Sequence, residues 1–134
     1  MQTFLPYPDF VASAKCLDWR RLGKQRVEAY QIVNVLTKGG IGWKNHPAVR
    51  MWRGYEDFLK LYVNAMIREW ICRGYKNNMT MYMEKDIKSL DIPEWHGNSD
   101  FHASHRSNLL RKDFSYYSRF KWSEPADLPY VWPV

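Results

Sequence analysis

The sequence of 134 residues has little cysteine and no long apolar segment. Its two cysteines, Cys16 and Cys72, form no CxxC pair and no other spacing that is typical of a metal site. In a chain without a signal peptide, we expect both to be reduced thiols. No apolar run approaches the ~18 residues that a membrane-spanning helix needs. We therefore expect a soluble, cytoplasmic protein that does not enter a membrane.

Signature motifs of several enzyme classes are also missing from the chain. It has no serine–histidine–aspartate order, no Walker loop, no dinucleotide-binding glycine motif and no HExxH zinc motif. We accordingly expect neither a cofactor nor a metal ion. If the protein is an enzyme, it has to use another kind of nucleophile.

Positive charge and aromatic rings are abundant. Twenty lysines and arginines against fourteen acidic residues give a net charge of +6, and aromatic residues make up 16% of the chain. This combination favours a nucleic-acid ligand, because cations neutralise phosphates and rings stack on or wedge between bases. The alternative is a basic protein whose lysine and arginine faces are simply solvated. The length and the 46% of hydrophobic residues predict one folded domain over residues 1–134.

The pattern of apolar residues predicts a compact all-α fold with two long helices, shorter helices and an extended aromatic C-terminal tail. The first long helix is expected over residues 10–36. Gly23 interrupts it, which indicates a kink or the close approach of another backbone, and Gly39 and Gly40 end it.

The second long helix has the clearest signal. Pro47 suits its first turn, apolar residues repeat at three- and four-residue spacing as far as Trp70, and Gly74 provides a C-cap. The rest of the chain is expected to form an extended segment over 1–7, helices over 79–90 and 99–112, a short turn over 114–120, and an extended tail.

Four polar residues of the first helix share one face. Arg21, Lys24, Gln25 and Glu28 occupy positions i, i+3, i+4 and i+7. They predict an acid/base site that faces phosphate, in a stretch where Arg20 and Arg26 add positive charge. The alternative is a solvated helix face with an ion pair between Lys24 and Glu28.

A second polar cluster lies between His102 and Arg106. We expect His105 and Arg106 to contact phosphates or bases, with Arg111 and Lys112 nearby. Two alternatives remain open. The His-x-x-His pair could bind zinc if His46 or His96 completed the site, or the histidines could cap a helix or form buried hydrogen bonds.

Two aromatic segments add candidate DNA contacts. Trp43 and His46 precede a helix N-terminus, whose free N–H groups suit a phosphate. Tyr116 and Tyr117 precede Arg119, and this alternation of rings and cations fits base stacking or groove insertion. It fits equally well a C-terminal segment whose rings pack onto the core.

Four stretches carry a resemblance to a known family. They are Arg21-Leu22-Gly23-Lys24-Gln25-Arg26-Val27-Glu28, Asn45-His46-Pro47-Ala48-Val49-Arg50-Met51-Trp52, Ser104-His105-Arg106 and Leu128-Pro129-Tyr130-Val131-Trp132-Pro133. Over nearly its whole length the chain resembles the phage-type pyrimidine-dimer DNA glycosylases, and most of all a bacterial and phage branch of that family.

The resemblance implies an enzyme that acts on damaged double-stranded DNA as a glycosylase and an abasic-site lyase. In that family an N-terminal amine attacks C1′ of the damaged nucleotide, the base leaves, a Schiff base forms, and β-elimination cuts the strand. An α-amine has a pKa of ~7.7–8.0, well below that of lysine, so an appreciable fraction is neutral at working pH. The dimer enzymes expose a threonine amine after methionine removal. Here the bulky Gln2 follows Met1 and is expected to prevent that removal, so the Met1 amine is the expected nucleophile.

The resemblance also implies roles for other residues. The position of the family's catalytic glutamate holds Arg21 or Leu22 here, so Glu28 is the expected carboxylate, and Gln25 is expected to orient the sugar. A monomer would contact DNA through Gln2, Arg20, Arg21, Lys24, Arg26, Trp43, His46, His105, Arg106, Arg111, Lys112, Tyr116 and Tyr117. The alternatives are a glycosylase for another damaged or modified base and a non-catalytic protein that binds distorted DNA.

Overall fold

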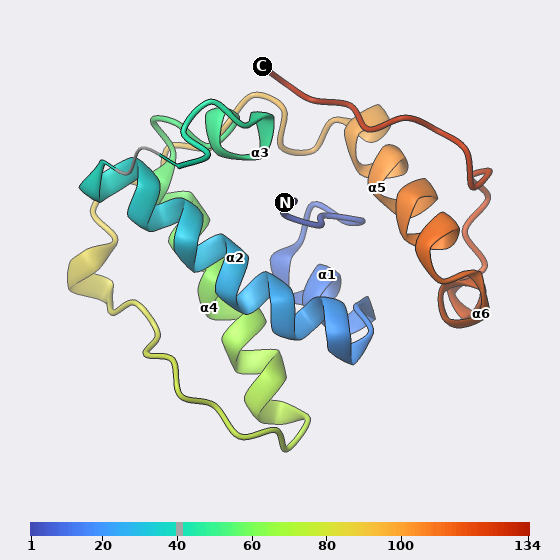
Figure 1. Ribbon diagram of the computed structural model, residues 1–134, viewed down its shortest axis with the longest axis horizontal. Coiled ribbons are helices and arrows are strands. Elements are labelled where there is room, and N and C mark those ends of the chain that lie inside the picture. The colour runs from blue at the N-terminus through green and yellow to red at the C-terminus, as the bar shows by residue number, and fades with distance from the viewer. Residues whose placement is uncertain (40–41) are drawn as a thin grey trace.

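The computed structural model describes residues 1–39 and 42–134, and within these ranges it contains helices and no strand. In chain order the helices are α1 (Phe10–Cys16), α2 (Trp19–Lys38), α3 (Pro47–Arg50), α4 (Glu56–Cys72), α5 (Ser99–Lys112) and α6 (Phe114–Tyr117), with 3-10 turns η1 (Glu84–Asp86) and η2 (Ser118–Phe120) (Figure 1). The predicted all-α class is confirmed. None of the helices in the described part of the chain is long and apolar enough to cross a membrane.

Helices α2 and α4 form the centre of the core and pack against each other, and α1 also packs on α4. Leu22, Ala29 and Ile32 of α2 meet a face of α4 that contains Tyr62 and Met66, and all five are fully buried. Burial of a side chain of leucine or isoleucine size stabilises the fold by ~1.5–3 kcal/mol. The periodic apolar residues of both helices are therefore core residues.

The first long helix is divided, and the break does not fall at Gly23. Leu17 and Asp18 are extended, with ψ angles of 139° and 160°. The backbone N–H of Asp18 binds the Tyr117 hydroxyl over 3.0 Å, so a tertiary contact satisfies this group. Gly23 lies inside α2, where a Cβ atom would be 3.0 Å from the Trp70 ring. Its role is close packing rather than a kink.

The end of α2 agrees with the glycine signal. The helix stops at Lys38, and Gly39 adopts a left-handed conformation with φ of 71°. This conformation lets the Gly39 N–H bind the Val35 carbonyl. Gly40, the second glycine of the predicted end, lies outside the described residues.

The second long helix is also divided. After α3 the chain turns, with Gly54 at a φ of 90°, and α4 begins at Glu56. The turn places Trp52 in the interior, where its indole N–H donates to Thr3 Oγ1 over 3.1 Å. The prediction of one continuous helix from Pro47 was wrong because this buried indole bond needs a different backbone path.

The predicted helix over residues 79–90 is not formed, apart from η1. The segment runs along α4, whose side chains bind its backbone. Asn64 binds the N–H and the carbonyl of Tyr82 over 2.8 and 2.9 Å, and Asp57 accepts the N–H of Lys88 over 2.9 Å. Side-chain partners thus replace the bonds that a helix would make within itself.

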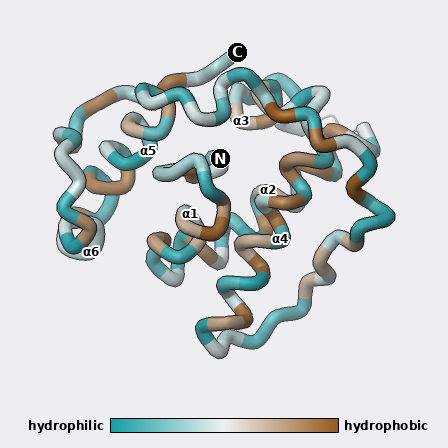
Figure 2. Tube along the Cα trace, turned by 180° about the vertical axis from the view of Figure 1, so that it is seen from behind, coloured by the Kyte–Doolittle hydropathy of each residue, from teal (hydrophilic) through white to brown (hydrophobic). Residues whose placement is uncertain are grey.

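The C-terminal third follows the prediction. Helix α5 spans residues 99–112 with Asn98 as its N-cap, and α6 with η2 forms the turn over 114–120. The tail is extended and runs past α5 toward α3 (Figures 1 and 2). The chain start lies between α2 and α5 (Figure 1).

Candidate active site

The first six residues cross the interior of the molecule in an extended conformation. Residues 2–6 are all buried, and Met1 is half-buried at their end. An extended buried segment cannot satisfy its own backbone groups, so these groups need partners elsewhere in the fold. The structure supplies those partners from α2, α4 and α5.

Gln25 of α2 is the central partner of this segment. Its side-chain Nε2 donates to the Gln2 carbonyl over 2.8 Å, and its Oε1 accepts the Phe4 N–H over 2.9 Å. The hydroxyl of Tyr62 lies 2.6 Å from the same Oε1 and 2.8 Å from the Phe4 carbonyl oxygen. Gln25 is only 1% exposed, so these bonds are shielded from water and hold the segment in one place.

Helix α5 holds the following residues of the segment. His105 Nδ1 accepts the Leu5 N–H over 2.9 Å, and His102 Nδ1 lies 2.7 Å from the Leu5 carbonyl oxygen, to which it donates. Arg106 donates to the Pro6 carbonyl over 2.7 Å. The histidine–arginine cluster is therefore turned inward, toward the chain start.

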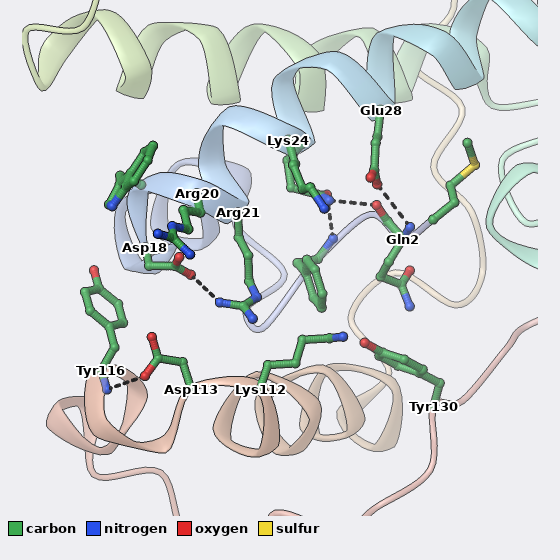
Figure 3. Close-up of a pocket in the computed structure, with 14 residues that line it drawn as sticks. Gln2, Asp18, Arg20, Arg21, Lys24, Glu28, Lys112, Asp113, Tyr116 and Tyr130 are labelled. Atoms are coloured by element: carbon green, nitrogen blue, oxygen red, sulfur yellow. Dashed lines mark hydrogen bonds and ion pairs between the residues drawn. The ribbon is translucent and has the colours of Figure 1, made fainter.

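Outside this clamped segment, a cleft of about 1190 Å³ opens between α2 and α5 (Figure 3). The α2 side carries the predicted face of that helix, and the other side carries the end of α5, the start of α6 and one tail residue. The cleft is lined by Met1, Gln2, Phe4, Asp18, Trp19, Arg20, Arg21, Lys24, Gln25, Glu28, Lys112, Asp113, Tyr116 and Tyr130. The four residues Arg21, Lys24, Gln25 and Glu28 thus share one cavity wall.

The cleft has a positive balance of charge. Four cations line it together with three carboxylates, and two of these carboxylates are engaged within the protein. Asp18 binds the Tyr117 hydroxyl and, over 3.1 Å, Arg21. Burial raises the pKa of Asp18, but these hydrogen bonds outweigh burial and lower it. Asp113 accepts the Tyr116 N–H as the cap of α6.

The third carboxylate, Glu28, lies beside the chain start. Its Oε2 accepts the backbone N–H of Gln2 over 3.4 Å (Figure 3). Met1 directly precedes Gln2 in the chain. His46 lies close enough for the charges of the chain start and of Glu28 to affect the pKa of its ring. Burial lowers the pKa of His46, the N-terminal ammonium lowers it further, and Glu28 opposes them. The amine, a carboxylate and an imidazole therefore share one region.

Comparison with protein families gave a match to part of the chain. The family model described as pyrimidine dimer DNA glycosylase matches residues 1–83, which is more than half of the chain. The chain belongs to the pyrimidine dimer DNA glycosylase family. A search of curated proteins and a search of solved structures each gave no match.

Membership of this family indicates a DNA-repair glycosylase whose substrate is DNA. The matched residues contain the clamped segment and α1 to α4. Helix α5, α6 and the tail lie beyond the match, so the glycosylase family accounts for only one wall of the cleft. Lys112, Tyr116 and Tyr130 on the other wall lie outside the matched residues.

The structure places four of the predicted DNA-contact residues inside the fold or away from the cleft. His105 is completely buried, and burial lowers its pKa to about 3, so it is a neutral interior residue. Tyr117 is completely buried against Asp18. Arg106 forms an ion pair with Glu124 over 2.7 Å.

Arg26 is the fourth. Its guanidinium stacks 4.5 Å from the Trp70 ring centre and binds Asn77, outside the cleft.

Three other predicted DNA contacts also lie outside the cleft lining. His46 caps α3 by accepting the Ala48 N–H over 3.0 Å, and its ring meets the Trp132 ring edge to face. Trp43 is 57% exposed with a φ of 62°, and Arg111 is exposed and bonded to Asn108. Among residues 1–39 and 42–134, no group of three or more histidine, cysteine or acidic side chains is arranged to hold a metal ion.

Sequence reasoning missed several residues of the cleft. Trp19 is 53% exposed at its edge, and the Arg20 guanidinium lies 5.4 Å from its ring centre. Asp18 is the N-cap residue of α2, and this role becomes evident only when the start of α2 is known from the structure. Tyr130 comes from the tail, where the resemblance and the excess of aromatic rings assigned it no specific role.

Proposed function

We propose that the protein excises pyrimidine dimers from duplex DNA and cleaves the strand at the resulting abasic site, with the α-amine of Met1 as nucleophile. The observation that carries this proposal is the contact between Gln2 and Glu28 at the end of the clamped segment. It supports an amine that is fixed beside a carboxylate in a basic cleft. The clamp restricts this amine to one location, as nucleophilic attack on a bound sugar requires.

The chemistry begins with the neutral amine of Met1. It attacks C1′ of the damaged nucleotide while the bond from C1′ to the base nitrogen breaks, and the base leaves with that electron pair. Glu28 stabilises the positive charge that develops on the sugar and accepts a proton from the attacking nitrogen. The bond from C1′ to O4′ then breaks, O4′ takes up the proton that Glu28 holds, and an iminium ion forms between Met1 and C1′.

The iminium ion acidifies the proton on C2′. A base removes this proton, the electrons form a double bond between C2′ and C3′, and the 3′ phosphate leaves, which cuts the strand. Water then hydrolyses the iminium ion and frees the amine. Glu28, the carboxylate beside the chain start, serves for the proton transfers, and His46 lies in the same region.

The basic residues of the cleft hold the DNA backbone in this proposal. Arg20 and Lys24 are exposed on α2, and Lys112 reaches into the cleft from α5 (Figure 3). Trp19 and Tyr116 offer rings for stacking on bases that the bent duplex exposes. One chain provides all of these groups, and we propose that the protein acts as a monomer.

Borohydride trapping tests the proposal directly. Reduction of the iminium ion should link the protein covalently to an ultraviolet-irradiated duplex, and the adduct should map to Met1. A protein whose amine is chemically blocked should give no adduct. An absent adduct, or trapping that persists after blocking, would show that the mechanism is wrong.

Two further measurements separate the alternatives. A panel of duplexes, each with one defined lesion, distinguishes excision of dimers from excision of another damaged base. A non-catalytic protein that recognises distorted DNA would bind in a salt-dependent manner and cut none of them.

A further inference from the structure

The imidazole of His46 is held from two sides. Its Nδ1 accepts the backbone N–H of Ala48 over 3.0 Å, and its ring stands at 86° to the Trp132 ring, with 5.9 Å between the ring centres. A backbone N–H can only donate, so Nδ1 carries no proton while this bond exists, and the neutral ring has its proton on Nε2. No described residue accepts a hydrogen bond from Nε2, and this atom is not enclosed by the protein.

Packing contacts join His46 to the chain start along two routes. His46 caps α3, and in the turn after α3 the Trp52 indole donates to Thr3 Oγ1 over 3.1 Å. On the other side, the Trp132 ring lies 5.4 Å from the ring of Tyr130, which lines the cleft at the end where the chain starts (Figure 3). The ammonium group of the chain start is one of the charges that lower the pKa of His46, as this placement requires.

His46 is a neutral donor in this position and not a base. Burial lowers the pKa of its ring, the N-terminal ammonium lowers it further, and Glu28 only opposes them. Protonation would also place a hydrogen on Nδ1, opposite the N–H of Ala48. Because Nε2 already carries the proton of the neutral ring, it cannot accept one from the sugar. It can donate a hydrogen bond to an anion beside the nucleophile.

We propose that the Nε2–H of His46 donates to the phosphate on the 3′ side of the abasic sugar and stabilises this phosphate as it leaves. This inference rests on the proposed function, because it concerns the strand cleavage that follows attack by Met1. The 3′ phosphate is the one nearer to the reacting atom, since C3′ is separated from C1′ only by C2′. The 5′ phosphate is attached farther away, through C4′ and C5′.

Negative charge on this phosphate grows during β-elimination. Glu28 takes the proton from C2′, the electron pair left on C2′ forms the double bond to C3′, and the pair of the C3′–O3′ bond goes to O3′. O3′ stays on phosphorus, so a phosphodiester becomes a phosphate monoester with one more negative charge. A donor that is already in place stabilises this charge more in the transition state than in the bound substrate. Formation of the iminium ion adds no charge to the phosphate, so it should not depend on His46.

Asparagine and glutamine each reproduce one of the two nitrogens of His46. His46→Asn places an amide oxygen where Nδ1 lies, so it keeps the cap for the Ala48 N–H and removes the more distant donor. His46→Gln places an amide N–H near the position of Nε2 and loses the cap. Asn45→Ala, exposed in the same turn, is the matched control. The probe is a duplex with one abasic site.

In single-turnover assays, His46→Asn should cut the abasic duplex about ten-fold or more slowly than the wild type, since a lost transition-state donor typically lowers a rate ~10²–10³-fold. Its borohydride adduct should form at the wild-type rate. His46→Gln should cut faster than His46→Asn, although its urea midpoint is lower, and Asn45→Ala should match the wild type. The inference is overturned if His46→Asn cuts at the wild-type rate, if adduct formation and cutting fall by the same factor, or if the glutamine variant cuts no faster than the asparagine variant.

A binding measurement tests the same contact from the side of the DNA. The probes are duplexes with one uncleavable tetrahydrofuran abasic site, whose 3′ phosphate is either natural or a methylphosphonate of one defined configuration. In Kd values from fluorescence anisotropy, the wild type should lose more affinity than His46→Asn for the methylphosphonate that lacks the contacted oxygen. Equal losses for both configurations overturn the inference. If the wild type gives no borohydride adduct with an abasic duplex, the proposed nucleophile is wrong, and these Kd values still decide whether His46 contacts the phosphate.

Discussion

The backbone N–H of Gln2 donates to Glu28 Oε2 over 3.4 Å, and the Gln2 carbonyl accepts from Gln25 Nε2 over 2.8 Å. Gln25 and Glu28 lie three residues apart on the same face of α2. One helix face therefore holds Gln2 at both ends of its backbone. The hydrogen bonds from α2 to Gln2 consequently fix the location of the adjoining α-amine.

The Glu28→Gln variant should lose most of its glycosylase and trapping activity while keeping its fold. The amide oxygen still accepts the Gln2 N–H, but it carries no charge to stabilise the sugar cation and is a poor proton acceptor. Loss of a positioned acid/base group lowers a rate ~10²–10⁴-fold. Single-turnover excision of a thymine dimer measures this effect, with Glu94→Gln as an exposed control outside the cleft. Wild-type excision by Glu28→Gln would remove Glu28 from the mechanism.

A chain extended by one glycine before Met1 should form no borohydride adduct through its displaced amine. One added residue moves the amine by up to ~3.3–3.6 Å, which is enough to take it out of reach of a fixed C1′ atom. Binding to the abasic duplex should change little, because the clamp on residues 2–6 is retained. Mass spectrometry of the unextended protein should show Met1 present and unformylated. Full trapping by the extended chain would point to a lysine nucleophile instead.

Sequence patterns predicted the features that depend on interactions between residues close together in the chain. The apolar repeat gave the buried face of α4, and the i, i+3, i+4, i+7 spacing brought Arg21, Lys24, Gln25 and Glu28 to one wall of the cleft. The range of α5 also followed, because Asn98 caps its start and no distant contact interrupts it.

Distant contacts decided the parts that the sequence did not reveal. The break at Asp18 depends on Tyr117, 99 residues away, and the inward turn of His105 depends on Leu5, 100 residues away. A cluster of histidines and an arginine looks the same in sequence whether it faces DNA or a buried backbone. Tyr130 reaches the cleft only because the extended tail runs along α5.

Substitution of Gln25 should destabilise the fold as well as the activity. In Gln25→Ala the Gln2 carbonyl and the Phe4 N–H lose their partner in a buried setting. Each unpaired buried group costs ~1–3 kcal/mol, so we expect the free energy of unfolding to fall by about 2–5 kcal/mol. Urea denaturation measures the change, and Gln31→Ala on the exposed side of α2 provides the comparison. Equal stability of the two variants would mean that the clamp contributes nothing.

Lys112→Ala should weaken DNA binding about equally for all sequences. Its ammonium group lines the cleft opposite α2, where a phosphate would lie in the proposed complex. Removal of one phosphate contact should lower the slope of log K against log salt by about 0.9. Titrations at several salt concentrations measure this slope. Lys85→Ala, in η1 and outside the cleft, should leave it unchanged, and an equal change in both variants would contradict a specific contact.

The stability of the protein should fall as the pH is lowered through the range of ordinary histidine titration. Burial lowers the pKa of His105 to about 3, whereas the unfolded chain has a histidine pKa of 6.5. The unfolded state therefore binds the proton first, and the stability that His105 contributes is complete above pH 6.5 and is lost as the pH falls toward 3. At about 1.4 kcal/mol per pH unit, the loss between pH 6.5 and 5 is about 2 kcal/mol. Burial also lowers the pKa of His102, which acts in the same direction.

Urea denaturation at pH 7, 6 and 5 tests this dependence. His105→Gln is the informative variant, because its amide oxygen can accept the Leu5 N–H and does not titrate. We expect a shallower dependence on pH for this variant than for the wild type, with the remaining slope due to His102. If both proteins lose stability equally between pH 7 and 5, a charged His105 is tolerated inside the fold, and the chain start is held less tightly by α5 than its hydrogen bonds indicate.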